Sequence, residues 1–410
     1  MRQQYLTLED VDIIGKTFLV RADMNSPIDM KTGKVKSDIR IKLHAKTIRE
    51  LSDKGAKIVV LAHQGRKGDL DFIPLKDHSE ILERILSRPV KYVKEVIGDN
   101  AFQEIRDLKT GEIIILENIR FHPDETLNKN FKEHGKSELI RNLTELADIF
   151  VLDAFSVSHR SHASVIGFTE LLPCVAGRAM ETELSIIDKI TKSVKKPFLC
   201  LLGGSKVEKG SDFIDFLITK EVDLILSGGL AGNLLLYASG IDIGKTNLEI
   251  LEKKWLLEHS KRMAKVLDQN SEKIKLPIDV AVKSKNGNRK EQDVSELPSE
   301  YPIYDIGSKT IMNYIKYIKK AKTIFVIGPL GVYEEENFSK GTFEVFNEIA
   351  KSNALSIASG GHTVEALKTF NLVDEFTYTS IAGGAFLEYM MGKKLPGTEC
   401  LRISAEKNKS

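Results

Sequence analysis

Eight short apolar runs alternate along the chain with longer segments in which apolar residues recur at helical spacing. The runs cover residues 17–22, 57–62, 112–118, 149–154, 198–203, 222–228, 323–328 and 354–359. Near-continuous apolar strands separated by helices are typical of parallel sheets that are covered by helices on both faces. The runs form two series of four, so the sequence predicts an α/β protein with two doubly wound domains.

A helical pattern connects the two series. The residues at helical spacing are Met180, Leu184, Ile187, Ile190 and Val194, and Pro197 ends the pattern. We interpret this segment as a helix between the domains and expect the region 170–197 to act as a hinge. The polar run 284–300 is expected to be a surface loop or hairpin rather than a boundary between domains.

Composition restricts the class of protein. Apolar and charged residues make up 42% and 29% of the 410 residues, which indicates a soluble globular chain. A formal net charge of only +2 argues against a general nucleic-acid-binding surface. The cysteines, Cys174, Cys200 and Cys400, are far apart and form no C-x-x-C pair. The chain shows no apolar signal core and no apolar stretch of about 20 residues, so we expect a cytoplasmic protein without a membrane segment.

Charged side chains follow the strands of the first half, where open α/β sheets bind their ligands. They are Arg21, Asp23 and Asn25, then His63 and Arg66, then Arg120 and His122, and then Asp153, His159, Arg160 and His162, with Arg40 expected early in the first crossover. A single arginine at a strand end is more often part of a structural ion pair. Several at one edge repel each other and need an anion, and the guanidinium fork suits carboxylate and phosphate. The pattern predicts a pocket for a small, multiply anionic ligand.

His159 and His162 have a spacing that would also suit a pair of metal ligands. No third ligand lies at a suitable spacing, and Arg160 between them would repel a cation. We therefore expect no protein-held metal at this position.

Glycine-rich turns follow the strands of the second half. They cover residues 202–210, 227–233, 327–342, 359–363 and 381–386. Glycine lets the backbone approach a ligand, helix N-termini bind phosphate, and Lys206 and Lys209 would add positive charge. Each turn alone is ordinary strand-to-helix chemistry, but five together favour a nucleotide site.

The segment GIDIGKT (240–246) resembles a Walker A loop but does not match it. It has three residues between its glycines where the pattern requires four, and no clear strand precedes it. We expect Lys245 to lie on an exposed connection. The chain also contains no G-x-G-x-x-G, which argues against a dinucleotide-binding dehydrogenase.

Seven motifs in a fixed order resemble those of the phosphoglycerate kinase family. They are RADMNSP (21–27), AHQGR (62–66), LENIRFH (116–122), DAFSVSHRSHAS (153–164), LGGSKVEKG (202–210), GPLGVYE (328–334) and GGHT (360–363). Each motif alone is only weakly specific for the family, but together they cover nearly the whole chain. The short form and GGHT look most like the archaeal branch of the family.

The resemblance implies two Rossmann-like parallel-sheet lobes that face each other across a cleft and are joined by a hinge helix. Residues 1–172, joined by the tail at about 395–410, would bind 3-phosphoglycerate. Residues 173–394, including the helix between the domains, would bind ATP or ADP with Mg²⁺. The implied enzyme is a cytoplasmic phosphotransferase of glycolysis and gluconeogenesis with a carboxyl group as acceptor. A monomer is the family default, with a dimer as the alternative.

The resemblance also implies roles for individual residues. Substrate binding would fall to Asp23, Met24, Asn25, Arg40, His63, Gln64, Gly65, Arg66, Arg120 and Arg160. Nucleotide binding would fall to Gly203, Gly204, Ser205, Lys206, Lys209, Gly228, Gly229, Pro329, Glu334, Gly360, Gly361, His362 and Thr363. The positive charges that stabilise the transferring phosphoryl group would be Arg40 and Lys206, assisted by Lys209. No general base would be needed, because the attacking carboxylate titrates near pH ~4 and is already ionised.

Two positions depart from the family pattern. His362 stands where the family commonly has a magnesium-binding aspartate, and Ile327 replaces the asparagine of a frequent W-N-G-P motif. We therefore expect the phosphates and water, rather than a protein side chain, to hold the metal.

Two other functions remain open from the residues. Another two-domain kinase for sugars or acids would lack the arginine set of the first half. An anion- or RNA-binding protein would use the basic edge without catalysis, but no array of stacking aromatic residues accompanies the arginines.

Overall fold

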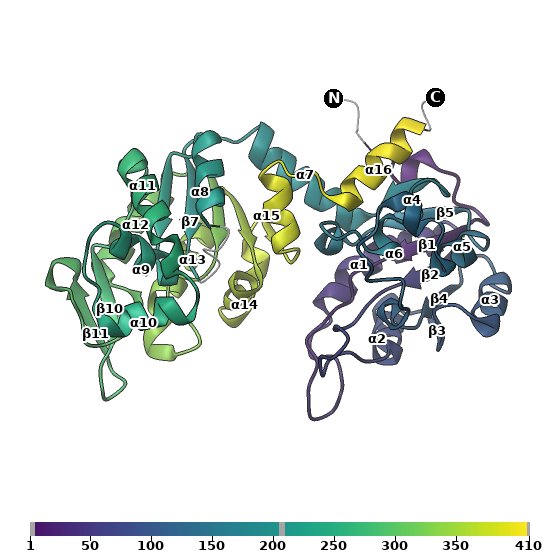
Figure 1. Ribbon diagram of the computed structural model, residues 1–410, viewed down its shortest axis with the longest axis horizontal. Coiled ribbons are helices and arrows are strands. Elements are labelled where there is room, and N and C mark those ends of the chain that lie inside the picture. The colour runs from purple at the N-terminus through teal and green to yellow at the C-terminus, as the bar shows by residue number, and fades with distance from the viewer. Residues whose placement is uncertain (1–4, 205–209, 408–410) are drawn as a thin grey trace. The chain divides into compact units, whose positions relative to one another are not determined.

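The computed structural model describes residues 5–204 and 210–407, and these form two compact units. The first unit comprises Met1–Ser185 with Gly384–Ser410, and the second comprises Ile186–Gly383. Figure 1 shows that each unit is a sheet with helices packed on it. No helix within the described ranges is both long and apolar enough to cross a membrane.

The first unit is built on a six-stranded parallel sheet with the strand order β3-β4-β2-β1-β5-β6. Its strands are β1 (Thr17–Arg21), β2 (Lys57–Leu61), β3 (Lys91–Val93), β4 (Ile113–Leu116), β5 (Ile149–Leu152) and β6 (Cys174–Ala176). The four strands predicted from apolar runs are confirmed and occupy the centre of the sheet. Their side chains are almost all buried on both faces, because helices cover both sides.

Nine helices of the described chain belong to the first unit. They are α1 (Ile39–Asp53), α2 (Lys76–Leu86), α3 (Asp99–Arg106), α4 (Phe131–His134), α5 (Glu138–Thr144), α6 (Ala163–Ile166), most of α7 (Arg178–Lys192), α15 (Gly384–Met390) and α16 (Pro396–Lys407). Short 3-10 helices lie at η1 (Leu8–Asp10), η2 (Ile119–Phe121) and η3 (Phe155–Val157).

The last helix of the described chain, α16, packs against the first sheet. The Ser404 hydroxyl of α16 accepts a hydrogen bond of 2.8 Å from the Cys174 amide of β6. Strand β6 pairs with β5, so residues 174–176 belong to the first unit. The sequence predicted them to be in the second unit. The two units divide within α7, the helix predicted from the spacing of Met180 to Ile190, and Val194 lies past its end.

The second unit is built on another six-stranded parallel sheet, with the order β15-β14-β13-β7-β8-β9. Its strands are β7 (Phe198–Leu202), β8 (Leu224–Ser227), β9 (Ile274–Lys275), β13 (Thr323–Ile327), β14 (Leu355–Ser359) and β15 (Tyr378–Ser380). The second series of four predicted strands is therefore confirmed as well. The observed fold class, α/β with two doubly wound parallel sheets, is therefore the predicted one.

Helices again flank the second sheet. They are α8 (Gly210–Thr219), α9 (Gly229–Ala238), α10 (Lys245–Lys253), α11 (Ser260–Asn270), α12 (Ser308–Ile318), α13 (Lys340–Lys351) and α14 (Gly361–Thr369), with 3-10 helices η5 (Leu257–His259), η6 (Val294–Glu296), η7 (Glu336–Phe338) and η8 (Val373–Glu375).

A three-stranded antiparallel sheet is added to the second unit. Its order is β11-β10-β12, with β10 (Asp279–Lys283), β11 (Arg289–Asp293) and β12 (Ile303–Ile306). Strands β10 and β11 form a hairpin, which confirms one of the two readings of the polar run 284–300.

Candidate active site

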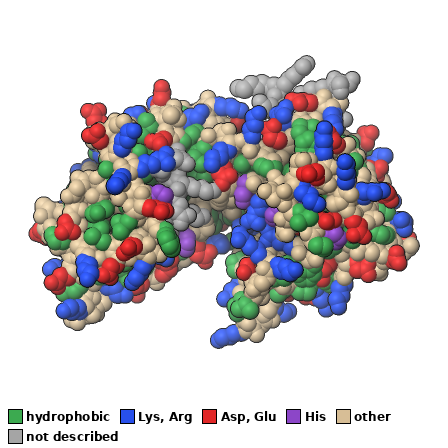
Figure 2. Space-filling view, viewed as in Figure 1, with side chains coloured by type: hydrophobic (Ala, Val, Ile, Leu, Met, Phe, Trp, Pro, Cys, Tyr) green, Lys and Arg blue, Asp and Glu red, His purple; other side chains and the backbone are tan. Residues whose placement is uncertain are grey.

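A basic cavity of about 730 Å³ lies at the strand ends of the first unit. It is lined by Arg66, Lys67, Phe72, Arg120, Phe121, His122, Pro123, Thr126, Arg160 and His162. Figure 2 shows Lys and Arg side chains gathered with histidines on the visible face of this unit. Three of the arginines predicted to bind an anion therefore meet at one cavity.

Arg120 is the most constrained of these cations. Its Nη1 donates a hydrogen bond to the Gly65 carbonyl, while its buried Nε has no hydrogen-bond partner in the described chain. Burial lowers the pKa of Arg120 to about 10, and the positive charges of Arg21 and Arg160 act in the same direction. A buried N–H donor beside neighbouring cations favours an anionic ligand, because the ligand would satisfy the donor and offset the repulsion.

Asn25 and Gly65 hold the loop that carries this contact. The Gly65 amide donates to Asn25 Oδ1 at 2.9 Å. Gly65 has a φ of +65°, and a Cβ atom there would lie 2.5 Å from the Asp71 carbonyl carbon. Only glycine fits this position, so the AHQGR turn brings its backbone close to both neighbouring loops.

Asp23 forms a second polar cluster at the end of β1. Its carboxylate accepts hydrogen bonds from Arg40 Nη1 and the Ser156 hydroxyl, and from the Asn25 amide at 3.1 Å. Burial opposes ionisation, but the charge of Arg40 and the hydrogen bond from the Ser156 hydroxyl outweigh it and hold the pKa of Asp23 below its usual value. Asp23 is therefore a carboxylate that fixes Arg40, the second residue of α1.

Arg21 lies beneath the cavity rather than on its wall. It is fully buried, and its Nε donates to Ser164 Oγ at 2.7 Å, while Nη1 donates to the Ala22 carbonyl. His63, at the end of β2, is almost fully buried beside it. The Arg21 guanidinium, the His63 ring and their partners thus form a packed layer under the anion-binding surface.

Glu125 is a site residue that the sequence did not indicate. Its buried carboxylate accepts hydrogen bonds from the Ser164 amide and hydroxyl at 2.8 and 2.7 Å. It also lies 3.9 Å from Arg21 Nη2 and 3.7 Å from His162 Nδ1. Glu125 follows no strand, so only the folded chain shows that it is the counter-charge of the buried layer. Ser156 does follow a strand, β5, and was missed because an uncharged hydroxyl does not stand out among the polar residues of its motif.

Two predicted ligand residues lie in the interior. Met24 and Gln64 are fully buried and do not line the cavity. The Gln64 side chain accepts from the Ser26 amide at 2.9 Å and donates to the Ser26 carbonyl at 3.0 Å. The structure thus places both side chains where they support the loop after β1.

The histidine pair at 159 and 162 does not form part of a metal cluster. Within residues 5–204 and 210–407 no group of three or more His, Cys, Asp and Glu side chains could hold a metal ion. Burial, followed by Arg120 and Arg160, lowers the pKa of His162 to about 3, so its ring is neutral near pH 7. It can donate or accept a hydrogen bond at the cavity wall without adding charge.

The glycine-rich turns of the second unit meet at a small cavity of about 20 Å³. It is lined by Gly203, Gly204, Ile327, Gly328, Gly360, Gly361, His362 and Thr363. The Gly204 amide donates to the Pro329 carbonyl at 2.8 Å. A Cβ atom on Gly203 would lie 2.2 Å from that carbonyl oxygen, so the two loops touch backbone to backbone and exclude any side chain.

The first turn of α14 opens this cavity to solvent. Gly360 has a φ of +102°, and Gly361 and His362 are exposed. The Thr363 hydroxyl accepts from the Gly328 amide and donates to the Ser359 carbonyl, both at 2.7 Å. Thr363 therefore fixes the turn, while the exposed N-terminus of α14 has the geometry that binds phosphate.

The remaining predicted nucleotide residues that the structure describes lie in loops and at a helix start of the second unit. Gly229 begins α9, and its amide donates to the Leu330 carbonyl at 2.7 Å, next to Gly228. Glu334 is exposed on the segment between Pro329 and α13. Ser205, Lys206 and Lys209 lie outside the described residues.

Lys245 does not take part in either cavity. It is the first residue of α10, its side chain is 91% exposed, and it pairs with Glu249 at 3.9 Å within the same helix. The predicted exposure of Lys245 is confirmed, although the residue begins a helix rather than lying in a connection, and Ile243 and Gly244 before it are buried.

Comparison with known proteins places the chain in a family. The two α/β sheets and their strand-end sites define a two-domain phosphotransferase. A sequence model of the family described as phosphoglycerate kinase matches residues 8–393. The chain therefore belongs to the phosphoglycerate kinase family, and it is a kinase of glycolysis.

The relatives agree over the full length. Phosphoglycerate kinase of Methanothermus fervidus is 41% identical over 406 residues, covering 99% of this chain and 98% of that protein. The enzyme of Thermococcus kodakarensis is 39% identical, with 98% of each chain covered. The crystal structure from Pyrococcus horikoshii OT3 superposes with a TM-score of 0.91 at 37% identity, covering 98% of this chain and 100% of that one. These relatives support the archaeal-type branch.

Proposed function

We propose that the chain transfers a phosphoryl group reversibly between ATP and the carboxylate of 3-phospho-D-glycerate, giving ADP and 1,3-bisphosphoglycerate. The observation that carries the proposal is the basic cavity of the first unit, where Arg66, Arg120 and Arg160 meet and the buried Nε of Arg120 has no partner in the described chain. A substrate with a phosphate and a carboxylate supplies two anionic groups for such a cavity.

In this proposal the acid lies in the first unit. Arg66, Arg120 and Arg160 bind its anionic groups, and His63 lies beside them. The Asp23 carboxylate accepts a hydrogen bond from its hydroxyl, and Asn25 recognises its hydroxyl and carboxylate end. Met24, Gln64 and Gly65 act through the backbone and packing of their loops, which agrees with the buried side chains of the first two.

The nucleotide lies in the second unit. Gly203, Gly204 and the N-terminus of α14 bind its phosphates, with Lys206 and Lys209 as further cations. Glu334 binds the ribose, and the turns at Gly228–Gly229 and Pro329 form the surrounding wall. Magnesium enters as part of the nucleotide substrate and is held mainly by phosphates and water, because His362 stands where the family commonly has an aspartate.

The phosphoryl transfer requires aligned substrates and nearby positive charge rather than a general base. The attacking carboxylate is ionised near neutrality, so no proton has to be removed from it. The developing charge on the phosphoryl group is stabilised by Arg40, which Asp23 holds in place, and by Lys206 and Lys209. Both substrates have to meet for transfer, so we propose that the units close on the bound ligands by bending at α7.

A coupled assay tests this function. Purified protein with Mg-ATP and 3-phosphoglycerate should form ADP and 1,3-bisphosphoglycerate, and Arg160→Ala should lose at least about 30-fold in kcat/KM. Arg141→Ala, an exposed arginine of α5 in the same unit, is the matched control and should behave as the parent. A filter-binding assay with RNA runs in parallel. RNA binding that depends on Arg160, without phosphoryl transfer, would replace this proposal by the nucleic-acid-binding alternative.

A further inference from the structure

The segment 331–341 of the second unit carries Glu334 and is anchored to the small antiparallel sheet. Its Val332 amide donates to the Tyr304 carbonyl of β12 at 2.7 Å. Its Glu335 carboxylate accepts from Lys283 Nζ of β10 at 2.7 Å. The position of Glu334 relative to the glycine-rich turns therefore depends on a sheet that contributes no side chain to the small cavity at those turns.

Asp305 of β12 contacts both ends of this segment. Its Oδ2 accepts a hydrogen bond of 2.7 Å from the Gly341 amide, at the start of α13. A Cβ atom on Gly331 or on Gly341 would lie only 2.4 or 2.2 Å from Asp305 Oδ1. The carboxylate is thus enclosed between the first and the last residue of the segment, and both must be glycine for it to fit.

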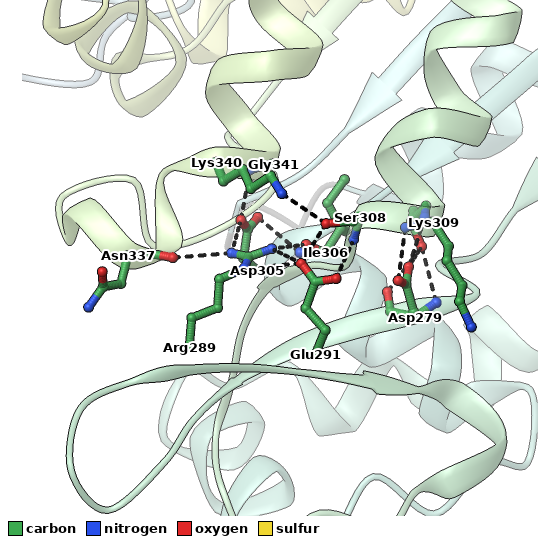
Figure 3. Close-up of polar contacts among 11 residues, drawn as sticks. Asp279, Arg289, Glu291, Asp305, Ile306, Ser308, Lys309, Asn337, Lys340 and Gly341 are labelled. Atoms are coloured by element: carbon green, nitrogen blue, oxygen red, sulfur yellow. Dashed lines mark hydrogen bonds and ion pairs between the residues drawn. The ribbon is translucent and has the colours of Figure 1, made fainter.

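Arg289 of β11 ties Asp305 to the middle of the segment (Figure 3). Its Nη1 donates to Asp305 Oδ2 at 2.8 Å and to the Asn337 carbonyl at 3.2 Å. Its Nη2 donates to the Ile306 carbonyl at 2.8 Å and to Glu291 at 3.2 Å. One planar guanidinium therefore bonds two strands and the loop at the same time, which a lysine ammonium cannot reproduce.

The Asp305 side chain is fully buried, and Arg289 is the cation within 4 Å of it. Burial raises the pKa of Asp305 to about 6, and the hydrogen bond and charge of Arg289 oppose this rise. Loss of Arg289 would leave a buried carboxylate without its cation, and the contact to the Gly341 amide would weaken as that carboxylate takes up a proton.

We infer that Arg289 is a positioning residue for nucleotide binding: together with Asp305 it fixes the segment 331–341 and thereby Glu334. The inference rests on the proposed nucleotide site of the second unit. Arg289 itself touches neither the glycine-rich turns nor the proposed substrates. Its effect is on the affinity for nucleotide, and it has no effect on the acid-binding cavity, which belongs to the other unit.

Calorimetric binding of Mg-ADP to the full chain tests the inference, with kinetics for 3-phosphoglycerate beside it. Arg289→Ala should weaken Mg-ADP binding about tenfold and leave KM for 3-phosphoglycerate within about twofold of the parent. Arg289→Lys keeps a charge beside Asp305 and should recover part of the affinity. Lys309→Ala is the control: its side chain is 58% exposed, it pairs with Asp293 on the same small sheet, and it should bind as the parent does.

The outcomes distinguish a failure of the inference about Arg289 from a failure of the proposed function. A folded Arg289→Ala variant that binds Mg-ADP as tightly as the parent overturns the inference and leaves the proposed function intact. A parent chain that does not bind Mg-ADP overturns both. If the alanine variant does not fold, Arg289→Lys decides: weaker Mg-ADP binding with an unchanged KM for 3-phosphoglycerate supports the inference, and parent-like binding overturns it.

Discussion

His63 Nδ1 lies 3.1 Å from Nη2 of Arg21, and both side chains are buried. Arginine is only a donor, so the Nδ1 atom of His63 has to accept and carries no proton. Burial, followed by the charge of Arg21, lowers the pKa of His63 well below its usual value. His63 is therefore a neutral imidazole with its proton on Nε2, ready to donate a hydrogen bond to an anion.

The neutral Nε2–H tautomer predicts how the protonation of His63 responds to pH. Nitrogen NMR of the histidine rings should show His63 as the neutral Nε2–H form from pH 8 down to pH 5, without a midpoint near the ordinary value of about 6.5. Arg21→Met removes the donor and the charge, so His63 in that variant should titrate at higher pH than in the parent. A parent His63 that becomes doubly protonated near pH 6.5 would contradict the assignment.

Arg178, at the start of α7, predicts how stability depends on pH. Its guanidinium bonds Glu50 at 2.6 and 2.7 Å and also contacts Glu9. The hydrogen bonds from Arg178 lower the pKa of each of these two carboxylates to about 2 from an ordinary 4.5. A lowered pKa gives stability that is present above the unfolded value, so the contribution is complete above about pH 5 and is lost as pH falls toward 2.

Denaturant unfolding between pH 7 and pH 2.5 measures this contribution. Arg178→Gln should lower the free energy of unfolding at pH 7 and flatten its decline below pH 4.5, because the carboxylates then titrate nearly alike in both states. Lys42→Ala, which removes an exposed ion pair with Asp38, should leave the slope unchanged. Equal slopes in the parent and in Arg178→Gln would show that other groups control acid unfolding.

Lys206 and Lys245 distinguish the proposed phosphate site from the Walker-like segment. Cations that act on the transferring phosphoryl group in related chemistry change the rate by about 10³–10⁵-fold. Lys206→Ala should reduce kcat at least about 10²-fold, with little change in the affinity for 3-phosphoglycerate. Lys245→Ala should behave as the parent, since its side chain is 91% exposed. The reverse pattern in steady-state kinetics would mean that the nucleotide occupies the 240–246 loop.

His362 predicts how the enzyme depends on magnesium. It is exposed at the first turn of α14, and a neutral imidazole is a poorer magnesium ligand than a carboxylate. His362→Ala should keep the magnesium requirement while its affinity for nucleotide falls only modestly. Initial rates measured over a magnesium titration would contradict this if activation by magnesium disappeared.

The sequence predicted the central strands well and the edge strands poorly. Strands β1, β2, β4 and β5 have a neighbour on each side and are buried on both faces, so each is a continuous apolar run. Within the two parallel sheets, the strands that sequence analysis missed are the edge strands β3, β6, β9 and β15, which have only two or three residues each. A short strand with one neighbour requires no such run.

The candidate site shows the same contrast between what a short stretch of sequence predicts and what only the folded chain reveals. Arg120 and Arg160 could be predicted because they follow strands, and parallel strands bring their ends together. Gln64 stands in the same motif as Arg66, yet its side chain is inside the loop, where it bonds Ser26. Sequence spacing does not distinguish a ligand contact from a loop support, because both require a polar residue near the strand end.

Calorimetry with each ligand separately shows whether the acid binds to the first unit and the nucleotide to the second. We predict that Arg160→Ala loses at least about 30-fold in affinity for 3-phosphoglycerate, because it removes a cation from the basic cavity. Its affinity for Mg-ADP should stay within about twofold of the parent, because that ligand is assigned to the other unit. Arg120→Ala should show the same contrast. Equal losses for both ligands, or a loss for Mg-ADP alone, would contradict the assignment of the acid to the first unit and the nucleotide to the second.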